Sequence, residues 1–140
     1  MRWQTWEDVG VDRMACAWLI LRFIDPAAEF AFVPAGQGPR PEGGEPFDIP
    51  GVRLTHRHGH CTFATLLREY QLADPVLQRI AGIVDEADSA QEVAVEPIAA
   101  GLDCLCRGLR RISPDDHTAL ERGRLLYEAL YAQLAAEPTP

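Results

Sequence analysis

The chain of 140 residues contains no lysine and no asparagine, and its only serines are Ser89 and Ser113. Without lysine there is no Schiff-base chemistry and no phosphate-binding loop that ends in Gly-Lys. Neither serine lies in the Gly-x-Ser-x-Gly turn of serine hydrolases. No Gly-x-Gly-x-x-Gly follows a predicted strand, so we expect no nucleotide cofactor. A polar site is therefore expected to use arginine, histidine, cysteine and carboxylate side chains.

The sequence also lacks a long apolar run, because Arg22 interrupts the stretch at 18–24, and we expect no membrane partner. Acidic residues at positions 7, 8 and 12 stand where a secretory signal would be apolar, which predicts a cytoplasmic protein. The four cysteines are then expected to be reduced. All thirteen cations are arginine, against 21 acids, and the formal charge of −8 disfavours nucleic acid as a partner.

Apolar periodicity and capping signals predict a helix-dominated α+β fold in a single domain over residues 1–140. We expect about five helices and a small sheet of two or three strands. A Gly- and Pro-rich loop is expected between the strands, with Phe47 and Ile49 holding it to the core. The predicted helices cover residues 12–25, 61–71, 75–87, 97–111 and 114–136, the predicted strands cover 29–34 and 52–56, and the loop covers 35–50.

Three of the four histidines and one cysteine lie within six residues, from His56 to Cys61. If this segment is extended, His56, His58 and His60 share one face, since side chains alternate with period two. Imidazoles at i and i+2 of a strand can both bind one divalent metal such as zinc. Gly59 would bend the strand and turn His60 elsewhere, and a solvated turn without a ligand is the alternative. The segment predicts a site for a metal or an oxyanion.

Two acidic groups are expected to complete such a site. Asp12 is predicted to cap the first helix, where free N–H groups and the helix dipole favour an anion, and Arg13 follows it. Asp85 and Asp88 share one face at the end of a later helix, where acids are electrostatically unfavourable; a solvated helix end is the alternative. The predicted ligands of a divalent transition metal (zinc, iron or manganese) are His56, His58, Asp12, Asp85 and Asp88.

Cys61 differs from the other three cysteines in its surroundings. It lies near a predicted helix N-terminus beside three histidines, and both conditions lower the pKa of a thiol. Cys61 is therefore a candidate catalytic nucleophile. Cys104 and Cys106 are expected to be buried apolar thiols, because positions i and i+2 of a helix point about 200° apart and do not bind one ion together.

Several segments resemble the C-terminal domain of ChrB-type chromate-resistance proteins. The longest is Val11-Asp-Arg-Met-Ala-Cys-Ala-Trp-Leu-Ile20, which is followed by Arg22-Phe-Ile-Asp-Pro26. The order of the segments matches the family along essentially the whole chain. Further segments that resemble it are Phe47-Asp-x-x-Gly51, Thr55-His56 before Gly59-x-Cys61-Thr-Phe63, Ile83-Val84 with Ala87-Asp88, Ala100-Gly-Leu102, Asp115-Asp116 before Leu120-Glu-Arg-Gly123, and Ala129-Leu-Tyr131.

The resemblance implies a role in chromate resistance. By the same resemblance, the site positions that match the family are Asp12, Arg13, His56 and Cys61. Members of the family often carry a separate N-terminal DNA-binding region, and some carry a rhodanese-like sulfurtransferase domain. The resemblance begins at residue 3, so we expect neither part in this chain and no binding to DNA.

The sequence departs from the family at two places. Asp85-Glu86 stands where a His-Asp pair is expected after Ile-Val, and Ala64 occupies a position that is often acidic. If these positions supply ligands in the family, the site of this chain is altered, or it is rebuilt with His58 and His60.

The first functional hypothesis is a small metal- or oxyanion-binding domain of the chromate-response type, which senses or detoxifies chromate. Arg13 would neutralise a tetrahedral dianion such as chromate or sulfate, and His56 would bind a metal with Asp85 or Asp88. Chromate and sulfate have the same charge and shape, so the sequence does not separate the two ligands.

Two other hypotheses belong to different classes. One is a metal-dependent redox enzyme, or a cysteine-dependent one that uses Cys61, acting on an unknown substrate. The other is an interaction module without a small ligand, in which a face with Tyr127 and Tyr131 forms a homodimer.

Overall fold

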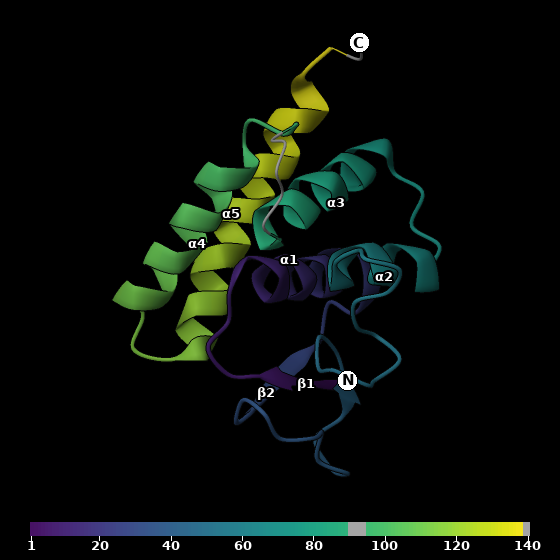
Figure 1. Ribbon diagram of the computed structural model, residues 1–140, viewed down its shortest axis with the longest axis vertical. Coiled ribbons are helices and arrows are strands. Elements are labelled where there is room, and N and C mark those ends of the chain that lie inside the picture. Colours follow the sequence, from purple (N-terminus) through teal and green to yellow (C-terminus); the bar gives the residue numbers. More distant parts are fainter. Residues whose placement is uncertain (90–94, 139–140) are drawn as a thin grey trace.

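The computed structural model describes residues 1–89 and 95–138. Within these residues it has five α-helices, one π-helix and a three-stranded sheet, which confirms the helix-dominated α+β fold. None of the described helices is both long enough and apolar enough to span a membrane. Figure 1 shows the strands at one end of the molecule, with α4 and α5 beside each other away from them. In chain order the elements are β1 (Arg2–Trp6), α1 (Val11–Leu19), η1 (Ile20–Ile24), β2 (Glu29–Val33), β3 (Glu45–Pro46), α2 (Thr62–Glu69), α3 (Pro75–Asp88), α4 (Ala99–Ile112) and α5 (Asp116–Ala136).

The sheet is parallel, with β1 as the central strand in the order β2-β1-β3. The sequence pattern does not reveal β1, because Trp3, Gln4 and Thr5 are all buried and so show no alternation. The strand predicted over 29–34 is confirmed as β2. The strand predicted over 52–56 is wrong, since Leu54 makes only an isolated bridge.

The Gly- and Pro-rich loop is hydrogen-bonded to a buried side chain, that of Gln4. The Nε2 of Gln4 donates to the carbonyl oxygens of Arg40 and Gly44 at 2.8 and 2.7 Å, and its Oε1 accepts from the N–H of Arg40 at 2.7 Å. Phe47 and Ile49 are buried, as the sequence predicts. The end of the loop is therefore fixed on the core where it enters the site described below.

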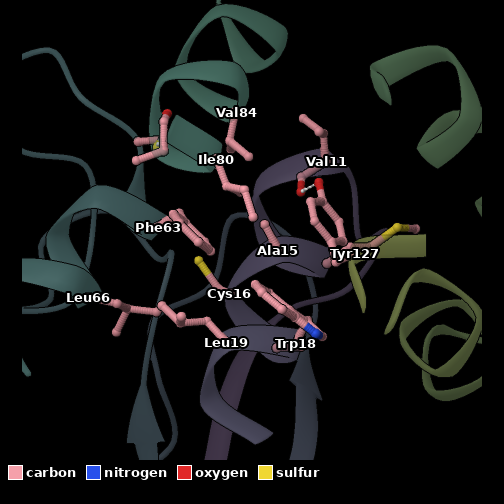
Figure 2. Packing of buried hydrophobic residues seen from close by; sticks show 14 of the residues in the cluster. Val11, Ala15, Cys16, Trp18, Leu19, Phe63, Leu66, Ile80, Val84 and Tyr127 are labelled. Carbon is pink, nitrogen blue, oxygen red and sulfur yellow. Dashed lines mark hydrogen bonds between the residues drawn. The ribbon is translucent and has the colours of Figure 1, made fainter. Parts of the chain in front are cut away.

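Helix α1 lies at the centre of the hydrophobic core, as its apolar sequence predicts. Figure 2 shows Trp18 of α1 between Phe63 of α2 and Tyr127 of α5. The Trp18 ring stacks on both, with ring centroids 6.5 Å from Phe63 and 6.1 Å from Tyr127. The single helix predicted over 12–25 is divided, because residues 20–24 continue α1 as the π-helix η1.

The aromatic side chains of α5 point into the chain's own core. Tyr127 is fully buried, and its hydroxyl donates to the carbonyl oxygen of Val11 at 2.7 Å. The hydroxyl of Tyr131 donates to Asp74 Oδ2 at 2.6 Å. The prediction that a face with Tyr127 and Tyr131 pairs two subunits is therefore wrong for this face, because Tyr127 has no exposed surface.

Two of the predicted helix starts need correction. Asp74 caps α3 by accepting from the N–H of Val76 at 2.8 Å, as predicted. Helix α5, however, is capped by Asp115 instead of Ser113, and α1 begins after Gly10 instead of Asp12. Asp12 therefore lies inside the first turn of α1, where its side chain is free to bond elsewhere.

Candidate functional site

An open pocket of about 180 Å³ lies where the first turn of α1, the end of α3 and the segments around residues 48 and 56 meet. Three carboxylates, one imidazole and one guanidinium are among its lining groups. These side chains come from four separate parts of the sequence. The lining residues are Trp6, Gly10, Val11, Asp12, Arg13, Asp48, Pro50, Thr55, His56 and Asp88.

His56 is the residue on which the carboxylates converge. Its Nε2 lies 2.9 Å from Asp88 Oδ2 and 3.5 Å from Asp12 Oδ2, and its Nδ1 lies 3.3 Å from Asp48 Oδ1. About half of the side chain (51%) is exposed, so the ring is reached from solvent as well. The structure thus brings three of the predicted residues, Asp12, His56 and Asp88, into one cluster.

Three of these side chains lie close enough together to be candidate metal ligands. Among the residues that the structure describes, Asp12, Asp48 and His56 form a group in which one ligand atom from each lies within 4.8 Å of the others. Two atoms that bind one zinc ion at about 2.1 Å are at most about 4.2 Å apart. Small side-chain rotations would therefore bring the three atoms onto one ion.

The carboxylate of Asp12 is buried and caps a helix other than its own. Its Oδ2 accepts from the N–H of Thr62 at 2.9 Å and its Oδ1 from the N–H of Phe63 at 3.1 Å, so it satisfies the first turn of α2. The negative charge also lies at the positive end of the α2 dipole. Asp12 therefore joins α1, α2 and the pocket.

Asp48 is the site residue that the sequence reasoning missed. Its Oδ1 accepts from the hydroxyl of Thr62 at 2.6 Å, and its Oδ2 lies 3.1 Å from Arg13 Nε. The backbone of Asp48 has a φ of +53°, a left-handed conformation that aspartate tolerates better than most residues. The signal that pointed to it was its place in the family-like segment Phe47-Asp-x-x-Gly51.

Arg13 reaches the pocket, but its charge already has a partner. Besides the ion pair with Asp48, its Nη2 donates to the carbonyl oxygen of the same residue at 3.4 Å. The guanidinium carbon also lies 5.7 Å from the centroid of the Trp6 ring, in a cation–π contact. Binding of an oxyanion by Arg13 stays a prediction, and such an anion would have to compete with Asp48.

The other two histidines of the segment do not share a face with His56. The backbone turns sharply at His58 and Gly59, whose φ angles are +53° and +76°, and Arg57 pairs with His60 across this turn. The expectation of an extended strand is therefore wrong. His58 is exposed and lies outside the pocket lining.

His60 is engaged in a separate pair. Its Nδ1 lies 2.9 Å from Asp85 Oδ2, and Asp85 Oδ1 accepts from the N–H of Cys61 at 2.5 Å. Asp85, like Asp12, thus accepts from the N-terminal end of α2. Neither His60 nor Asp85 lines the pocket.

Cys61 has the opposite of the expected thiol environment. Its side chain is buried, and its Sγ donates to the carbonyl oxygen of Ala81 at 3.8 Å. Burial and the nearby charge of Asp12 raise the pKa of the thiol far above its ordinary value. The expected lowering of this pKa is therefore wrong, because burial disfavours the thiolate and the carboxylates of Asp12 and Asp85 place negative charge beside it.

Burial disfavours the charged forms of the carboxylates that line the pocket. Burial and the charges of Asp48 and Asp88 raise the pKa of Asp12 to about 7. Burial also raises the pKa of Asp48, although Arg13 opposes this effect. Burial lowers the pKa of His56, but its hydrogen bond to Asp88 and the charges of the other carboxylates outweigh this and raise it. A bound cation would relieve the same repulsion.

Comparison with known proteins places the chain in a family. The model of the ChrB C-terminal domain matches residues 3–134. The chain belongs to this family. The Protein ChrB of Cupriavidus metallidurans is 31% identical over 136 residues, which cover 96% of this chain. The chain spans about two fifths of that relative, since the match covers 41% of its length. No solved structure matches the chain.

Membership in the ChrB-type chromate-resistance family confirms the resemblance of the sequence segments. The two places at which a departure from the family is expected lie outside the pocket lining. Ala64 is in the first turn of α2, and Glu86 accepts from the N–H groups of Val95 and Glu96 at 2.6 and 3.0 Å. Neither of these places contributes a residue to the pocket lining.

Proposed function

We propose that this ChrB domain binds one divalent transition metal ion (zinc, iron or manganese) through Asp12, Asp48 and His56, as part of a chromate response. The observation that carries the proposal is the convergence of two buried carboxylates and one imidazole on an open pocket. A mixed set of oxygen and nitrogen donors suits zinc, iron and manganese. The raised pKa values of Asp12 and Asp48 give the site a further preference for a cation.

Asp88 has a different role from the three ligands. Its Oδ2 lies 2.9 Å from His56 Nε2, and the other ring nitrogen faces Asp48. A carboxylate that accepts the N–H of one ring nitrogen leaves the other free for a metal ion and fixes the ring orientation. We assign Asp88 as the residue that positions His56.

An oxyanion would reach this pocket as a ligand of the metal ion. Three carboxylates face a single guanidinium there, and that guanidinium is paired with Asp48. A dianion such as chromate or sulfate would be repelled by this charge unless a cation neutralised it first. Chromate binding should therefore depend on bound metal. A cysteine-based reductase is not favoured, because the Cys61 thiol is buried and its thiolate is disfavoured.

The proposal is tested by titrating metal-free protein with Zn²⁺ in a calorimeter. We expect one ion per chain, and the His56→Ala variant should bind at least about 100-fold more weakly, because a direct ligand is lost. His58→Ala is the matched control, since it removes a histidine two residues away that lies outside the pocket. Wild type that binds no Zn²⁺, Mn²⁺ or Fe²⁺, or equal losses in both variants, would refute the site.

A second titration tests the oxyanion. Chromate is added to the metal-free protein and to the Zn²⁺-loaded protein, with sulfate as the competitor of equal charge and shape. We expect heat of binding in the loaded protein and none in the metal-free one. Equal binding to both forms would show that binding of the anion does not depend on bound metal.

A further inference from the structure

Thr62 is the first residue of α2, and its fully buried side chain lies outside the pocket lining. It contacts all three of the proposed metal ligands. Its backbone N–H donates to Asp12 Oδ2 at 2.9 Å, and its hydroxyl donates to Asp48 Oδ1 at 2.6 Å. The hydroxyl oxygen also lies 3.4 Å from His56 Nδ1. One residue therefore links the three side chains that the proposed site requires.

Asp12 and Asp48 need such a link, because they repel each other. Both carboxylates are buried, and the charge of Asp48 raises the pKa of Asp12. Two like charges in a buried site turn apart or share a proton unless donors hold each of them. Thr62 supplies one donor to each carboxylate, and hydrogen bonds to a charged acceptor are stronger than those between neutral groups. These two donors therefore oppose the separation of the carboxylates.

The oxygens that Thr62 holds are the ones that face His56. Asp48 Oδ1, which accepts from the hydroxyl, lies 3.3 Å from His56 Nδ1, whereas Asp48 Oδ2 lies 3.1 Å from Arg13 Nε. Asp12 Oδ2, which accepts from the N–H, lies 3.5 Å from His56 Nε2. Thr62 thus turns one oxygen of each carboxylate toward the imidazole.

These hydrogen bonds leave the ligand atoms able to bind an ion. A carboxylate oxygen has two lone pairs, and Thr62 occupies one of them on Asp12 Oδ2 and one on Asp48 Oδ1. The hydroxyl has a single proton, which serves Asp48 at 2.6 Å and not His56 Nδ1 at 3.4 Å. Nδ1 is the ring nitrogen that Asp88 leaves free, so no donor from Thr62 competes with an ion there.

We propose that Thr62 is a positioning residue of the metal site, whose N–H and O–H hold one oxygen of Asp12 and one of Asp48 toward the ion that His56 binds. The assignment rests on the proposed function. Thr62 acts through the two carboxylates, and removing such a hydrogen-bond partner of a metal ligand typically weakens metal binding by about 10- to 100-fold.

The role of the hydroxyl is tested with Thr62→Val, which keeps the shape of the side chain and the backbone N–H but removes the O–H. In the calorimetric titration with Zn²⁺ we expect this variant to bind one ion per chain, about 10-fold more weakly than wild type. Thr62→Ser keeps the hydroxyl and should bind within about 2-fold of wild type.

Tyr131→Phe is the matched control for the loss of a hydrogen bond. The hydroxyl of Tyr131 also donates to a carboxylate at 2.6 Å, that of Asp74, and neither residue lines the pocket. Urea unfolding should show a loss of stability in Tyr131→Phe as well as in Thr62→Val, because each variant leaves a carboxylate without one donor. Only Thr62→Val should bind Zn²⁺ more weakly.

The outcomes separate the positioning role from the site itself. A Thr62→Val variant that binds Zn²⁺ like wild type, a Thr62→Ser variant that binds no better than Thr62→Val, or an equal loss of affinity in Tyr131→Phe overturns the assignment. If Thr62→Val does not fold, Thr62→Ala and Thr62→Ser repeat the comparison, since these two side chains differ only in the hydroxyl, and equal affinities in that pair overturn it as well. A wild type that binds no ion refutes the metal site and the positioning role with it, whereas lost binding in His56→Ala alone refutes only the positioning role.

Discussion

Two histidine–aspartate pairs connect the same two parts of the chain, yet they differ in what surrounds them. His56 with Asp88 and His60 with Asp85 both join the segment before α2 to the last turns of α3, and both pairs have a shortest distance of 2.9 Å. The first pair meets two more carboxylates in a pocket, whereas the second meets the N–H of Cys61 and solvent.

The difference shows that the third group, and not the pair, decides what a histidine–aspartate contact does. Around His56 the added carboxylates are those of Asp12 in α1 and of Asp48. Together with the imidazole they form the candidate group of metal ligands. Around His60 the added group is a backbone donor, so the pair contributes to the cap of α2.

The largest difference concerns the two carboxylates that cap α2. Asp12→Ala leaves two buried N–H groups, those of Thr62 and Phe63, without an acceptor and should cost about 3 kcal/mol of unfolding free energy. Asp85→Ala removes one partly exposed acceptor and should cost about 1 kcal/mol. Urea unfolding of the metal-free proteins measures both. Asp12→Asn, which keeps one of the two acceptor oxygens, should recover at most about half of the loss. Equal costs for the two alanine variants would contradict the distinction.

The free energy of unfolding should depend on pH, because Asp12 and His56 have different pKa values in the folded and unfolded protein. Because the pKa of Asp12 is raised from 3.8 to about 7, the folded protein holds a proton that the unfolded chain has lost between these values. The free energy of unfolding of the metal-free protein should therefore fall as pH rises, by about 2 kcal/mol between pH 5 and 7. The raised pKa of His56 acts in the same direction, since its stabilisation is lost as pH rises through that pKa.

Urea unfolding at a series of pH values, with a chelator present, measures this slope. In Asp12→Asn the slope should be at most about half as steep, because the main titrating group is gone. With Zn²⁺ present the slope should reverse, since the metal displaces the protons of its ligands. Stability that rises from pH 5 to 7 without metal would contradict the charge assignment.

The smallest expected effect separates the two aspartates of α3. Asp88→Asn changes the group that positions His56 and should weaken Zn²⁺ binding about 10-fold. Asp85→Asn, three residues earlier on the same helix, should leave the Zn²⁺ affinity within about 2-fold. Both values come from the same calorimetric titration. A larger loss in Asp85→Asn than in Asp88→Asn would exchange the roles of the two pairs.

Much of the fold could be predicted from local patterns. The helices have apolar stripes, and the Asp74-Pro75 start of α3 is a signal within the sequence. The strand β1 could not be found this way, because a central strand covered on both faces shows no alternation. The strand expected at 52–56 failed for the opposite reason, since β-favouring residues there have no neighbouring strand to pair with beyond one bridge at Leu54.

The site was predictable only in part. The site residues that could be found from the sequence lie in a histidine-rich segment (His56) and in two acidic helix ends (Asp12 and Asp88). The structure brings these three residues together. Asp48 lies in a loop where no periodicity applies, and its place depends on the left-handed turn and on Thr62. Nothing local distinguishes His60 from His56, because the turn at residues 58–59 and the packing of α3 decide which carboxylate each one meets.

The cap that Asp12 provides to α2 also bears on how the protein folds. Helix α2 has eight residues, which is too short to be stable alone in water, and its acceptor from α1 lies 50 residues earlier in the chain. A peptide with the α2 sequence should therefore show no helix, and α2 should become ordered only when α1 docks against it. Because Asp12 also lines the pocket, the rate at which a metal site forms during refolding should follow that long-range contact.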